Sequence, residues 1–528
     1  MKFSEIRSLL FYTAPKQLSQ YAWFRLKLFF IRRNLFPFLP LKKQEVCWLD
    51  WKETKSNKIY IRGNEFTFLN LSTVFEEKVE WGYGQNGKLW AYQLESFEFL
   101  HQKSSNNETG IKLINEFICY LNEHPNAFTP YTASLRIINW IKFFSEHKIE
   151  NRFFINSLYE QSRKLYHSIE WHLQNNHLLE NGFALLFAGL FLNEGAFFSC
   201  GKRIIITELR KQILPDGGHF ERSPMYHQLM LQRVLDVINL LQKNKATEKE
   251  VIQELKDISS GMLGWMNSMK FDNGMMPMVN DSAEGISLTC DELNQYAREL
   301  KIQEKKITLN ESGFRKVKTS VYECLIDVGG LEQVNAGHGH AASLSFILHV
   351  HKQPFIIDTG ISTYEAGERR TFERSTEAHN TVTFKNRAQS ELWDSFRVGK
   401  RVKILGINEG KNFLEGSIRF FQGAIVHTRR FEFFDNSLIV SDSISGEILE
   451  PPVSFLHVDK NSEIAHVKSK VNSNIADIKF EGYQNIKIDK GFTSTEFNRL
   501  VNCYRISISF STNLTTTFTF LPNLTTGA

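Results

Sequence analysis

The 528-residue sequence has few cysteines and no long apolar run. Its 6 cysteines are widely spaced and form no Cys-x-x-Cys pair. This excludes a zinc ribbon or a redox motif, and it argues against a disulfide framework in so large a chain. We expect these cysteines to be free thiols or small core side chains. No segment approaches the roughly 20 mostly apolar residues of a membrane-spanning helix, so we predict no transmembrane segment.

Excess charge of one sign is also small. With 63 Lys and Arg against 58 Asp and Glu, the net charge of +5 is too low to indicate a nucleic-acid partner. A composition of 42% hydrophobic and 23% charged residues excludes wholesale disorder. The length suggests about two to four domains. Aromatic residues are abundant, with 44 Phe, 15 Tyr and 9 Trp. Such residues mostly fill cores, and in a minority of proteins they line carbohydrate-binding grooves.

The N-terminal stretch is basic and amphipathic. Leu9–Tyr12 is too short for the apolar part of a signal peptide and no small-residue cleavage site follows it. We therefore predict a cytoplasmic protein, with a periplasmic or membrane-associated location as the alternative. The apolar segment 21–31 is interrupted by Arg25 and Lys27, and Glu5 is the only acid before it. Such a helix either packs on the body with its basic face in water or makes peripheral membrane contact on an anionic surface.

The spacing of apolar residues changes once along the chain. From about residue 88 to 305 it is helical, in blocks joined by short polar segments, which predicts an array of helical hairpins. After about residue 318 the period is two, as in Ser343–Val350, Phe431–Phe434, Arg505–Phe510 and Thr516–Phe520, which predicts an antiparallel sandwich. We predict an N-terminal basic helix and cap region over 1–85, a helical domain over 86–315 and an antiparallel β-sandwich over 316–528.

Imidazole and carboxylate side chains gather at the start of the β part. Gly337-His-Gly-His-Ala341 precedes one alternating segment, Asp358 follows the next, and His379 opens another. In a strand, His338 and His340 would project to the same side and can face one site. Two imidazoles and a carboxylate are ligands that Zn²⁺ uses where thiolates are absent. Separate histidines bonded to the backbone remain the alternative.

Three further polar clusters lie in the helical part. Gln174-Asn-Asn-His177 precedes a strongly apolar helix, where amides normally cap the helix end but paired amide and imidazole donors can also hold a carboxylate. The segment Pro215–His227 is densely polar; its Glu221 and Arg222 can be an ion pair, and its tyrosine a core residue. Asn280-Asp-Ser282 alone indicates only a turn.

With these clusters placed, the sequence resembles the heparinase II/III-like polysaccharide lyases. The resemblance spans about residues 15 to 450, with the motifs in the same order. The matching segments are Asn175–Leu179, Leu186–Gly189, Asp216–Tyr226, Asn280–Ser282, His338–Ala341, Asp358–Gly360, Arg374–Thr376, His379–Val382, Gln389–Trp393 and Ser395–Arg397. It implies a multidomain chain, α then β: an incomplete (α/α) toroid followed by an antiparallel β-sandwich.

The resemblance also implies an activity, β-elimination at a hexuronate. A base removes the C5 proton, the C4–O bond breaks, and a 4,5-unsaturated uronate remains. The C5 proton leaves only if the adjacent carboxylate is neutralised as charge develops on it. Asn176 and His177 match the family's neutralising position. Tyr226 matches the catalytic tyrosine, which can protonate the leaving O4 or take the C5 proton, and His338 matches a histidine that serves as base or orients the site.

Other family positions carry over as well. Tyr364 lies where relatives have a second tyrosine, although loop length varies there. His340, Asp358 and His379 match the family's zinc ligands, and the Zn²⁺ there is structural, bracing the loop that carries His338.

Two arginines are candidate substrate contacts. Guanidinium groups bind carboxylate or sulfate bidentately, so Arg136 and Arg222 can contact an acidic glycan. Ion pairing within the helical part is the alternative for both.

We therefore predict an enzyme, a polysaccharide lyase acting on an acidic, uronate-containing polysaccharide or oligosaccharide. The basic helix with Gln17, Tyr21 and Arg25 resembles longer bacterial members associated with cell-surface polysaccharide loci, which suggests a link to such glycans. A glycoside hydrolase using Glu221 and Asp281 as acid and base stays open. So does a non-catalytic glycan-binding or assembly factor. The sequence leaves the oligomeric state open.

Overall fold

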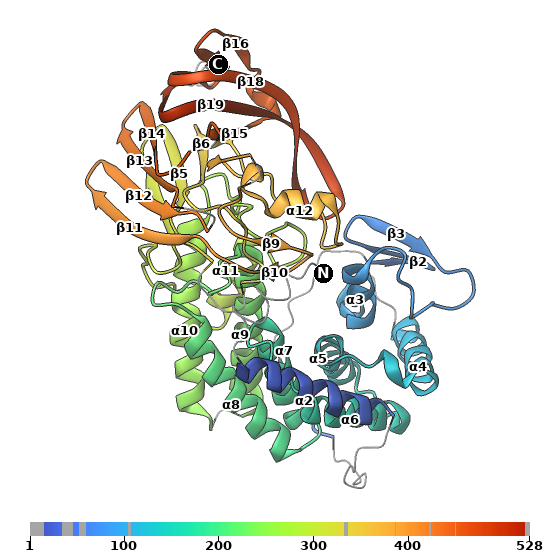
Figure 1. The fold of residues 1–528 in the computed structure, drawn as a ribbon. Coiled ribbons are helices and arrows are strands. Elements are labelled where there is room, and N and C mark those ends of the chain that lie inside the picture. The colour runs from blue at the N-terminus through green and yellow to red at the C-terminus, as the bar shows by residue number, and fades with distance from the viewer. Residues whose placement is uncertain are drawn as a thin grey trace, which may run out of the picture.

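The structure is a computed structural model that describes residues 15–33, 46–51, 60–103, 107–245, 247–331, 336–385, 387–421, 424–448 and 450–522. A helical part is followed by a large, curled antiparallel sheet (Figure 1), so the predicted fold class is confirmed. Leu9–Tyr12, the segment weighed as part of a signal peptide, lies outside the described residues. All cysteines are free, as predicted, and four of them are buried: Cys200, Cys290, Cys324 and Cys503.

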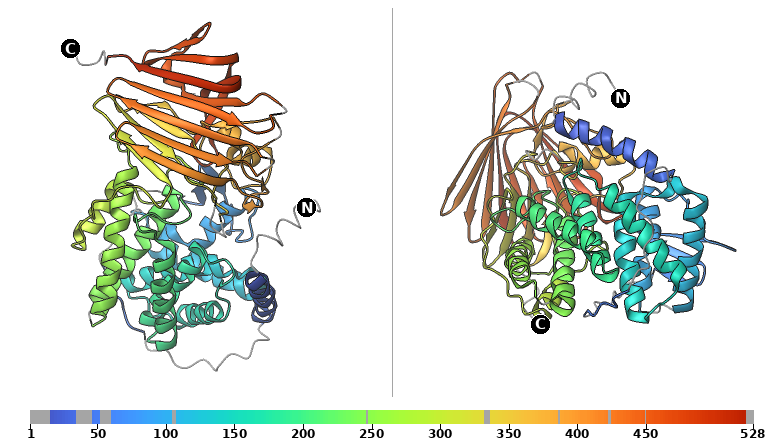
Figure 2. Two further views of the ribbon diagram at one scale, coloured as in Figure 1. Left: turned by 60° about the vertical axis from the view of Figure 1, so that its left-hand side comes forward. Right: turned by 90° about the horizontal axis from the view of Figure 1, so that it is seen from below.

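The helical part consists of helices that pack side by side below the sheet (Figure 2). They are α3 (Lys88–Ser96), α4 (Asn107–Glu123), α5 (Pro130–His147), α6 (Arg152–His167), α7 (Asn176–Phe191), α8 (Gly195–Gln212), α9 (Pro224–Asn244), α10 (Lys249–Met269) and α11 (Cys290–Glu299). An earlier helix, α2 (Pro15–Arg32), lies on their outer side. A small sheet that the sequence analysis did not predict, β1 (Ile61–Arg62), β2 (Glu65–Phe68) and β3 (Leu71–Val74), stands beside α3.

Helix α7 is the centre of the helical core. Almost all of its residues are buried, in agreement with its nearly continuous apolar sequence. Its neighbour α8 approaches very closely, since a Cβ at Gly201 would lie 2.5 Å from the Leu186 backbone nitrogen. The core therefore fixes the first turn of α7, where Asn176 and His177 lie.

The β part contains one long path of antiparallel strands. Their order is β11-β12-β13-β14-β19-β15-β7-β6-β5-β4. The bounds are β4 (Phe314–Lys318), β5 (Tyr322–Asp327), β6 (Phe346–Val350), β7 (Gln353–Ile356), β11 (Lys403–Gly410), β12 (Phe413–Arg419), β13 (Val426–Phe434), β14 (Ser437–Ser445), β15 (Val453–Asp459) and β19 (Arg499–Phe520). Side chains alternate between buried and exposed along β12, β13 and β14, as a sheet with one buried face requires.

Shorter elements and one long ribbon complete this part. They are α12 (Glu368–Arg374), β8 (Val382–Thr383), β9 (Leu392–Trp393), β10 (Arg397–Val398), β16 (Ala465–Val467), β17 (Lys470–Asn472) and β18 (Ala476–Glu496). Strand β18 pairs with β19 over almost its whole length. The ribbon of these two strands arches over α12 (Figure 1).

A buried ion pair holds the sheet together. Arg429 on β13 is 1% exposed and donates to both carboxylate oxygens of Asp442 on β14, at 2.7 and 3.0 Å, and to the backbone oxygens of Leu344 and Asn380. Burial alone would raise the pKa of Asp442, but Arg429 and His427 lower it to about 2. The stability from this pair is thus fully present above the carboxyl's ordinary pKa of 3.8 and is lost as the pH falls toward 2.

We expect Arg429→Leu to destabilise the protein by about 3–5 kcal/mol, because it leaves the Asp442 carboxylate buried and unpaired. The matched control is Arg430→Ala, on the opposite face of the same strand. Arg430 is 34% exposed and its pairs with Glu415 and Glu432 are 3.5 Å long, so its loss should cost about 1 kcal/mol or less. Thermal unfolding by calorimetry measures both, and equal shifts for the two variants would contradict the account.

Candidate active site

The loop before Tyr226 is held in place by Asp216. One carboxylate oxygen accepts from the Gly218 nitrogen at 3.1 Å, and the other accepts from the backbone and hydroxyl of Ser312, at 2.9 and 2.6 Å. Gly217 has a positive φ of 81°, and a Cβ there would lie 2.2 Å from the Gly261 oxygen. The Asp-Gly-Gly motif is therefore structural: it lets the loop pass tightly against α10.

Tyr226 lies in the first turn of α9, and the helix cap fixes its position. Ser223 is the N-cap, and its hydroxyl oxygen accepts from the Tyr226 backbone nitrogen at 3.2 Å. The same hydroxyl donates to the backbone oxygen of Asp281 at 2.6 Å. Pro224 at the first helical position adds stiffness. The cap thus connects Tyr226 to the Asn280–Ser282 loop.

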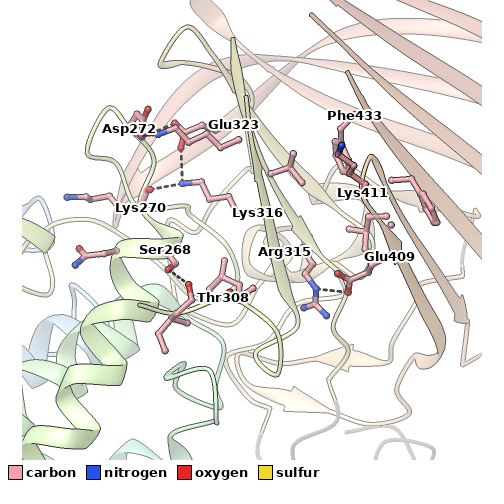
Figure 3. Close-up of a pocket in the computed structure, with 18 residues that line it drawn as sticks. Ser268, Lys270, Asp272, Thr308, Arg315, Lys316, Glu323, Glu409, Lys411 and Phe433 are labelled. Atoms are coloured by element: carbon pink, nitrogen blue, oxygen red, sulfur yellow. Dashed lines mark hydrogen bonds and ion pairs between the residues drawn. The ribbon is translucent and has the colours of Figure 1, made fainter. Parts of the chain in front are cut away.

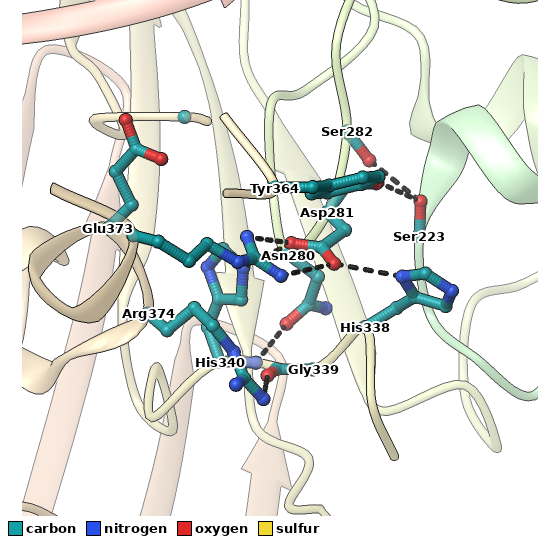
Figure 4. Close-up of polar contacts among 12 residues, drawn as sticks. Ser223, Asn280, Asp281, Ser282, His338, Gly339, His340, Tyr364, Glu373 and Arg374 are labelled. Carbon is teal, nitrogen blue, oxygen red and sulfur yellow. Dashed lines mark hydrogen bonds and ion pairs between the residues drawn. The ribbon is translucent and has the colours of Figure 1, made fainter. Parts of the chain in front are cut away.

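Asp281 is the centre of the polar contacts between the two parts of the chain (Figure 4). It accepts from His338 Nδ1 and from His340 Nε2, each at 2.8 Å. Arg370 on α12 donates to both of its oxygens, at 2.6 and 2.7 Å. The neighbouring Asn280 accepts from the His340 backbone nitrogen at 3.0 Å. A loop of the helical part therefore orients both histidines of the β part.

The charge state of Asp281 fixes the tautomers of its partners. Burial would raise its pKa, but Arg370 and the bonds from His338 and His340 hold that pKa well below its usual value. An ionised carboxylate only accepts hydrogen bonds, so His338 must carry a proton on Nδ1 and His340 one on Nε2. In the neutral imidazole of His338, the lone pair is then on Nε2, the atom that can take a proton.

The motif that carries His338 and His340 precedes a strand, as predicted, but the two histidines are not themselves in a strand, so the side-chain alternation of a strand does not bring them together. Residues 337–341 form a turn and loop, and strand β6 begins only at Phe346. The two imidazoles face a common point for another reason, because both bond to Asp281.

Two tyrosine hydroxyls meet beside His338. Tyr364 donates to the Tyr226 hydroxyl at 3.4 Å, and the Tyr226 ring lies 4.0 Å from the His338 ring, centroid to centroid. Burial, together with Tyr131, raises the pKa of Tyr226 well above 10, and burial does the same for Tyr364. Both phenols therefore keep their protons at neutral pH. The structure brings together the predicted residues Tyr226, His338 and Tyr364.

The amide and imidazole at the start of α7 have different surroundings. Asn175 is the N-cap and accepts from the His177 backbone nitrogen at 3.2 Å, so Asn176 is not needed as a cap. Asn176 is 2% exposed, and its Oδ1 has no hydrogen-bond partner among the described residues. His177 stacks on the Tyr131 ring with centroids 4.0 Å apart, and its Nδ1 lies 3.3 Å from Glu170 Oε1.

Glu221 is electrostatically coupled to both clusters. Its side chain is buried, and neither carboxyl oxygen has a hydrogen-bond partner among the residues that the structure describes. Burial raises its pKa, while His338 and His177 both oppose that rise. Burial, Tyr131 and Glu221 all raise the pKa of Tyr226. The charges of an imidazole from the α7 cluster and of one from the Tyr226–His338 cluster therefore both act on the Glu221 carboxyl.

The two arginines predicted to contact substrate are occupied within the protein. Arg136 is 1% exposed, donates to Gln161 at 2.7 Å and to the Glu95 backbone oxygen at 3.0 Å, and burial lowers its pKa to about 10. Arg222 pairs with Asp327 and donates to two backbone oxygens, of Ser312 and Gly330. Both guanidinium groups are thus occupied, which corrects the prediction of substrate contacts. The alternative, ion pairing within the helical part, does not describe them either, because Arg222 pairs with Asp327 on β5 and Arg136 bonds to an amide and a backbone oxygen.

The three predicted zinc ligands lie together in the β part. His379 donates from Nδ1 to Asp358 Oδ2 at 2.7 Å, and the rings of His340 and His379 are 5.3 Å apart. His340 Nδ1 and His379 Nε2 are both buried without a partner among the described residues, which suits two metal-binding lone pairs. In the described part of the chain, however, no three His, Cys, Asp or Glu side chains are arranged around one point for an ion.

A separate cavity of about 530 Å³ lies between the helical part and the sheet (Figure 3). Its lining includes Lys316, Lys318 and Arg315, which pair with Glu323, Asp272 and Glu409 at 2.9, 2.6 and 2.7 Å. No predicted site residue lines it. With these charges paired, the cavity offers no reason to place the reaction there.

Sequence reasoning missed three residues of the site. Arg370 was not singled out. Asp281 was considered as part of a turn or of a hydrolase pair, and Glu221 as the other member of that pair or as an ion-pair partner of Arg222. For Asp281 the role in a hydrolase does not fit the structure, because four bonds from one arginine and two histidines occupy its oxygens. The signal for Arg370 lay in its position four residues before Arg374, inside a segment rich in buried charge.

Comparisons with known proteins agree with the fold. A helical part followed by an antiparallel sheet is also the fold of heparinase III, whose crystal structure aligns with a TM-score of 0.67 at 16% identity over 86% of this chain and 81% of that one. The family model described as Heparinase II/III N-terminus matches residues 15–306, and the one described as Heparinase II/III-like, C-terminal matches residues 302–521. The chain belongs to the heparinase II/III family.

Two curated relatives are heparin-sulfate lyases. The protein from Pedobacter heparinus is 24% identical over 277 residues, which is 46% of this chain and 41% of the relative. The protein from Bacteroides stercoris is 25% identical over 304 residues, which is 51% of this chain and 43% of the relative. The alignments thus span less than half of either relative.

Proposed function

We propose that this protein is a polysaccharide lyase that cleaves a uronate-containing glycan by β-elimination, acting on a bacterial surface polysaccharide. The observation that carries the proposal is the grouping of Tyr226, Tyr364 and the Asp281-bound His338. A base and an acid in one site suit elimination, and Asp281, one member of the carboxyl pair that a hydrolase would need, is occupied by Arg370 and two histidines. Membership of the heparinase II/III family and the two lyase relatives support the same reaction.

The roles follow from the protonation states. His338 Nε2 has the available lone pair and takes the C5 proton, while Asp281 stabilises the imidazolium that forms. Tyr226, protonated at neutral pH, donates its proton to the leaving O4. Asn176 and His177 donate to the uronate carboxylate as negative charge moves onto it. Tyr364 holds the Tyr226 hydroxyl in place.

The test is a panel of uronate polysaccharides, starting with the surface glycan of the source organism. Ultraviolet absorbance of the new double bond is the readout. We expect at least one polymer to yield unsaturated product. Binding of a uronate glycan without such product from any polymer would contradict the proposal and favour the non-catalytic glycan-binding factor.

We also propose that His340, Asp358 and His379 hold a structural Zn²⁺. The support is chemical: two buried imidazole nitrogens with free lone pairs, and a carboxylate next to one of them. When bound, the ion would brace the loop that carries His338.

The cytoplasmic location also stays a proposal, which cell fractionation tests.

We expect His340→Ala to lose the bound metal and to unfold at a lower temperature than the parent protein. Metal analysis of the purified protein and thermal unfolding measure the two effects. The control is His466→Ala, because His466 is exposed on β16 and its imidazole bonds to the backbone oxygen of Lys468, two residues away. Stoichiometric zinc in the His340→Ala variant would contradict the ligand assignment.

A further inference from the structure

Helix α2 has two apolar faces, and one of them packs on the protein. Leu28 and Ile31 are buried, and Leu28 packs with Phe24 against Phe128 and Ala133. Arg32 donates to the Phe128 backbone oxygen from two nitrogens, at 3.0 and 2.8 Å. The sequence left open whether this basic helix packs on the rest of the protein or lies on a membrane. For this face, the structure shows that it packs on the protein. These contacts fix which side of α2 points outward.

The outward face of α2 is also apolar. Four of its large side chains are between 39% and 59% exposed: Trp23, Leu26, Phe29 and Phe30. Tyr21 lies on the packed side instead, seven residues before the buried Leu28, and its ring is 5.3 Å from that of His172. Trp23, Leu26 and Phe30 are three and four residues apart, so they form one stripe, opposite Leu28 and Ile31. Single exposed apolar residues are ordinary, but a contiguous group marks an interaction surface. We name this group the α2 outer face.

Cations accompany the aromatic rings of the α2 outer face. The Arg33 guanidinium carbon lies 3.7 Å from the Phe29 ring centre, and the Lys27 Nζ lies 5.4 Å from that of Trp23. The sequence from Ile6 to Lys43 contains no acidic residue. The surface therefore combines aromatic and aliphatic side chains with positive charge only. Figures 1 and 2 show α2, in dark blue, on the outer side of the helical part.

We propose that the α2 outer face docks the protein on an anionic phospholipid surface. Trp, Phe and Leu then enter the headgroup boundary, and Lys27, Arg25 and Arg33 contact lipid phosphates. Charge complementarity favours this occupant, because α2 carries cations and no acidic residue, while the phosphates of such a surface are negative. None of the described helices is long and apolar enough to cross a bilayer, so the contact is peripheral. The inference is independent of the proposed lyase activity.

The test uses the full-length protein and vesicles of two compositions, phosphatidylcholine alone and phosphatidylcholine with phosphatidylglycerol. We expect flotation with the anionic vesicles only, decreasing as salt is raised. Trp23→Ser with Phe30→Ser should lower the bound fraction at least about tenfold, and so should Lys27→Glu with Arg33→Glu. Unchanged thermal unfolding of these variants shows that they still fold.

Matched controls come from other exposed positions. Phe434→Ser with Val467→Ser removes apolar side chains that are 48% and 59% exposed, and Lys112→Glu with Lys487→Glu removes exposed cations. Both control variants should float like the parent protein. No flotation of the parent with anionic vesicles, or equal flotation of the α2 variants, would overturn the proposal. A lipid-free dimer that the Trp23→Ser variant abolishes would assign the face to a second copy of the chain instead.

Discussion

Tyr226→Phe is expected to lower kcat by about 10²–10⁴-fold, the contribution of a positioned general acid. The substitution removes only the hydroxyl that accepts from Tyr364 at 3.4 Å, and it keeps the ring that packs on His338. Folding should be intact, because that 3.4 Å contact with another tyrosine is the one hydrogen bond found for the hydroxyl among the described residues. Steady-state kinetics on the polymer that the parent protein cleaves, together with thermal unfolding, measure both quantities.

The control for this variant is Tyr322→Phe. Tyr322 is also buried, and its hydroxyl donates to the Ser437 backbone oxygen in the sheet at 3.5 Å. Its loss should leave kcat unchanged. Near-parental rates in Tyr226→Phe would remove Tyr226 from the mechanism.

Asn176→Ala is expected to lower kcat by about 10²–10³-fold, because it removes a donor to the carboxylate on which charge develops. The structure separates this role from helix capping, which Asn175 performs through its bond from the His177 nitrogen. Asn175→Ser is therefore the matched control, since serine keeps the cap and should keep activity. If Asn175→Ser were inactive and Asn176→Ala active, the amides would serve only the helix end.

The fold was largely predictable because the period of apolar residues is a local property. The helical hairpins and the later antiparallel strands followed from it. The strands predicted over 505–510 and 516–520 are one strand, β19, that runs through the polar residues between them. Pairing with β14 from Asn513 onward, and with β18 at Phe510 and Thr515 on either side of the stretch, supports β19 there. Such non-local support cannot be predicted from the segment itself.

The site was predictable only where it resembled known family motifs. Asp281 connects His338, His340 and Arg370, which lie 57, 59 and 89 residues away in sequence, so its central role is visible only in the fold. The same limit explains the error on Arg222, whose partner Asp327 is 105 residues distant. From the sequence, an arginine in a motif can be taken for a ligand contact, because the acid that pairs with it in the folded protein is not visible there.

Cleavage in heavy-oxygen water tests the central claim most directly. A lyase breaks the C4–O bond without adding water, whereas a hydrolase places a water oxygen on one of its products. With the polymer that the panel identifies, we predict by mass spectrometry unsaturated products that carry no heavy oxygen. Saturated products with heavy oxygen at the new reducing end would contradict the account and identify a hydrolase.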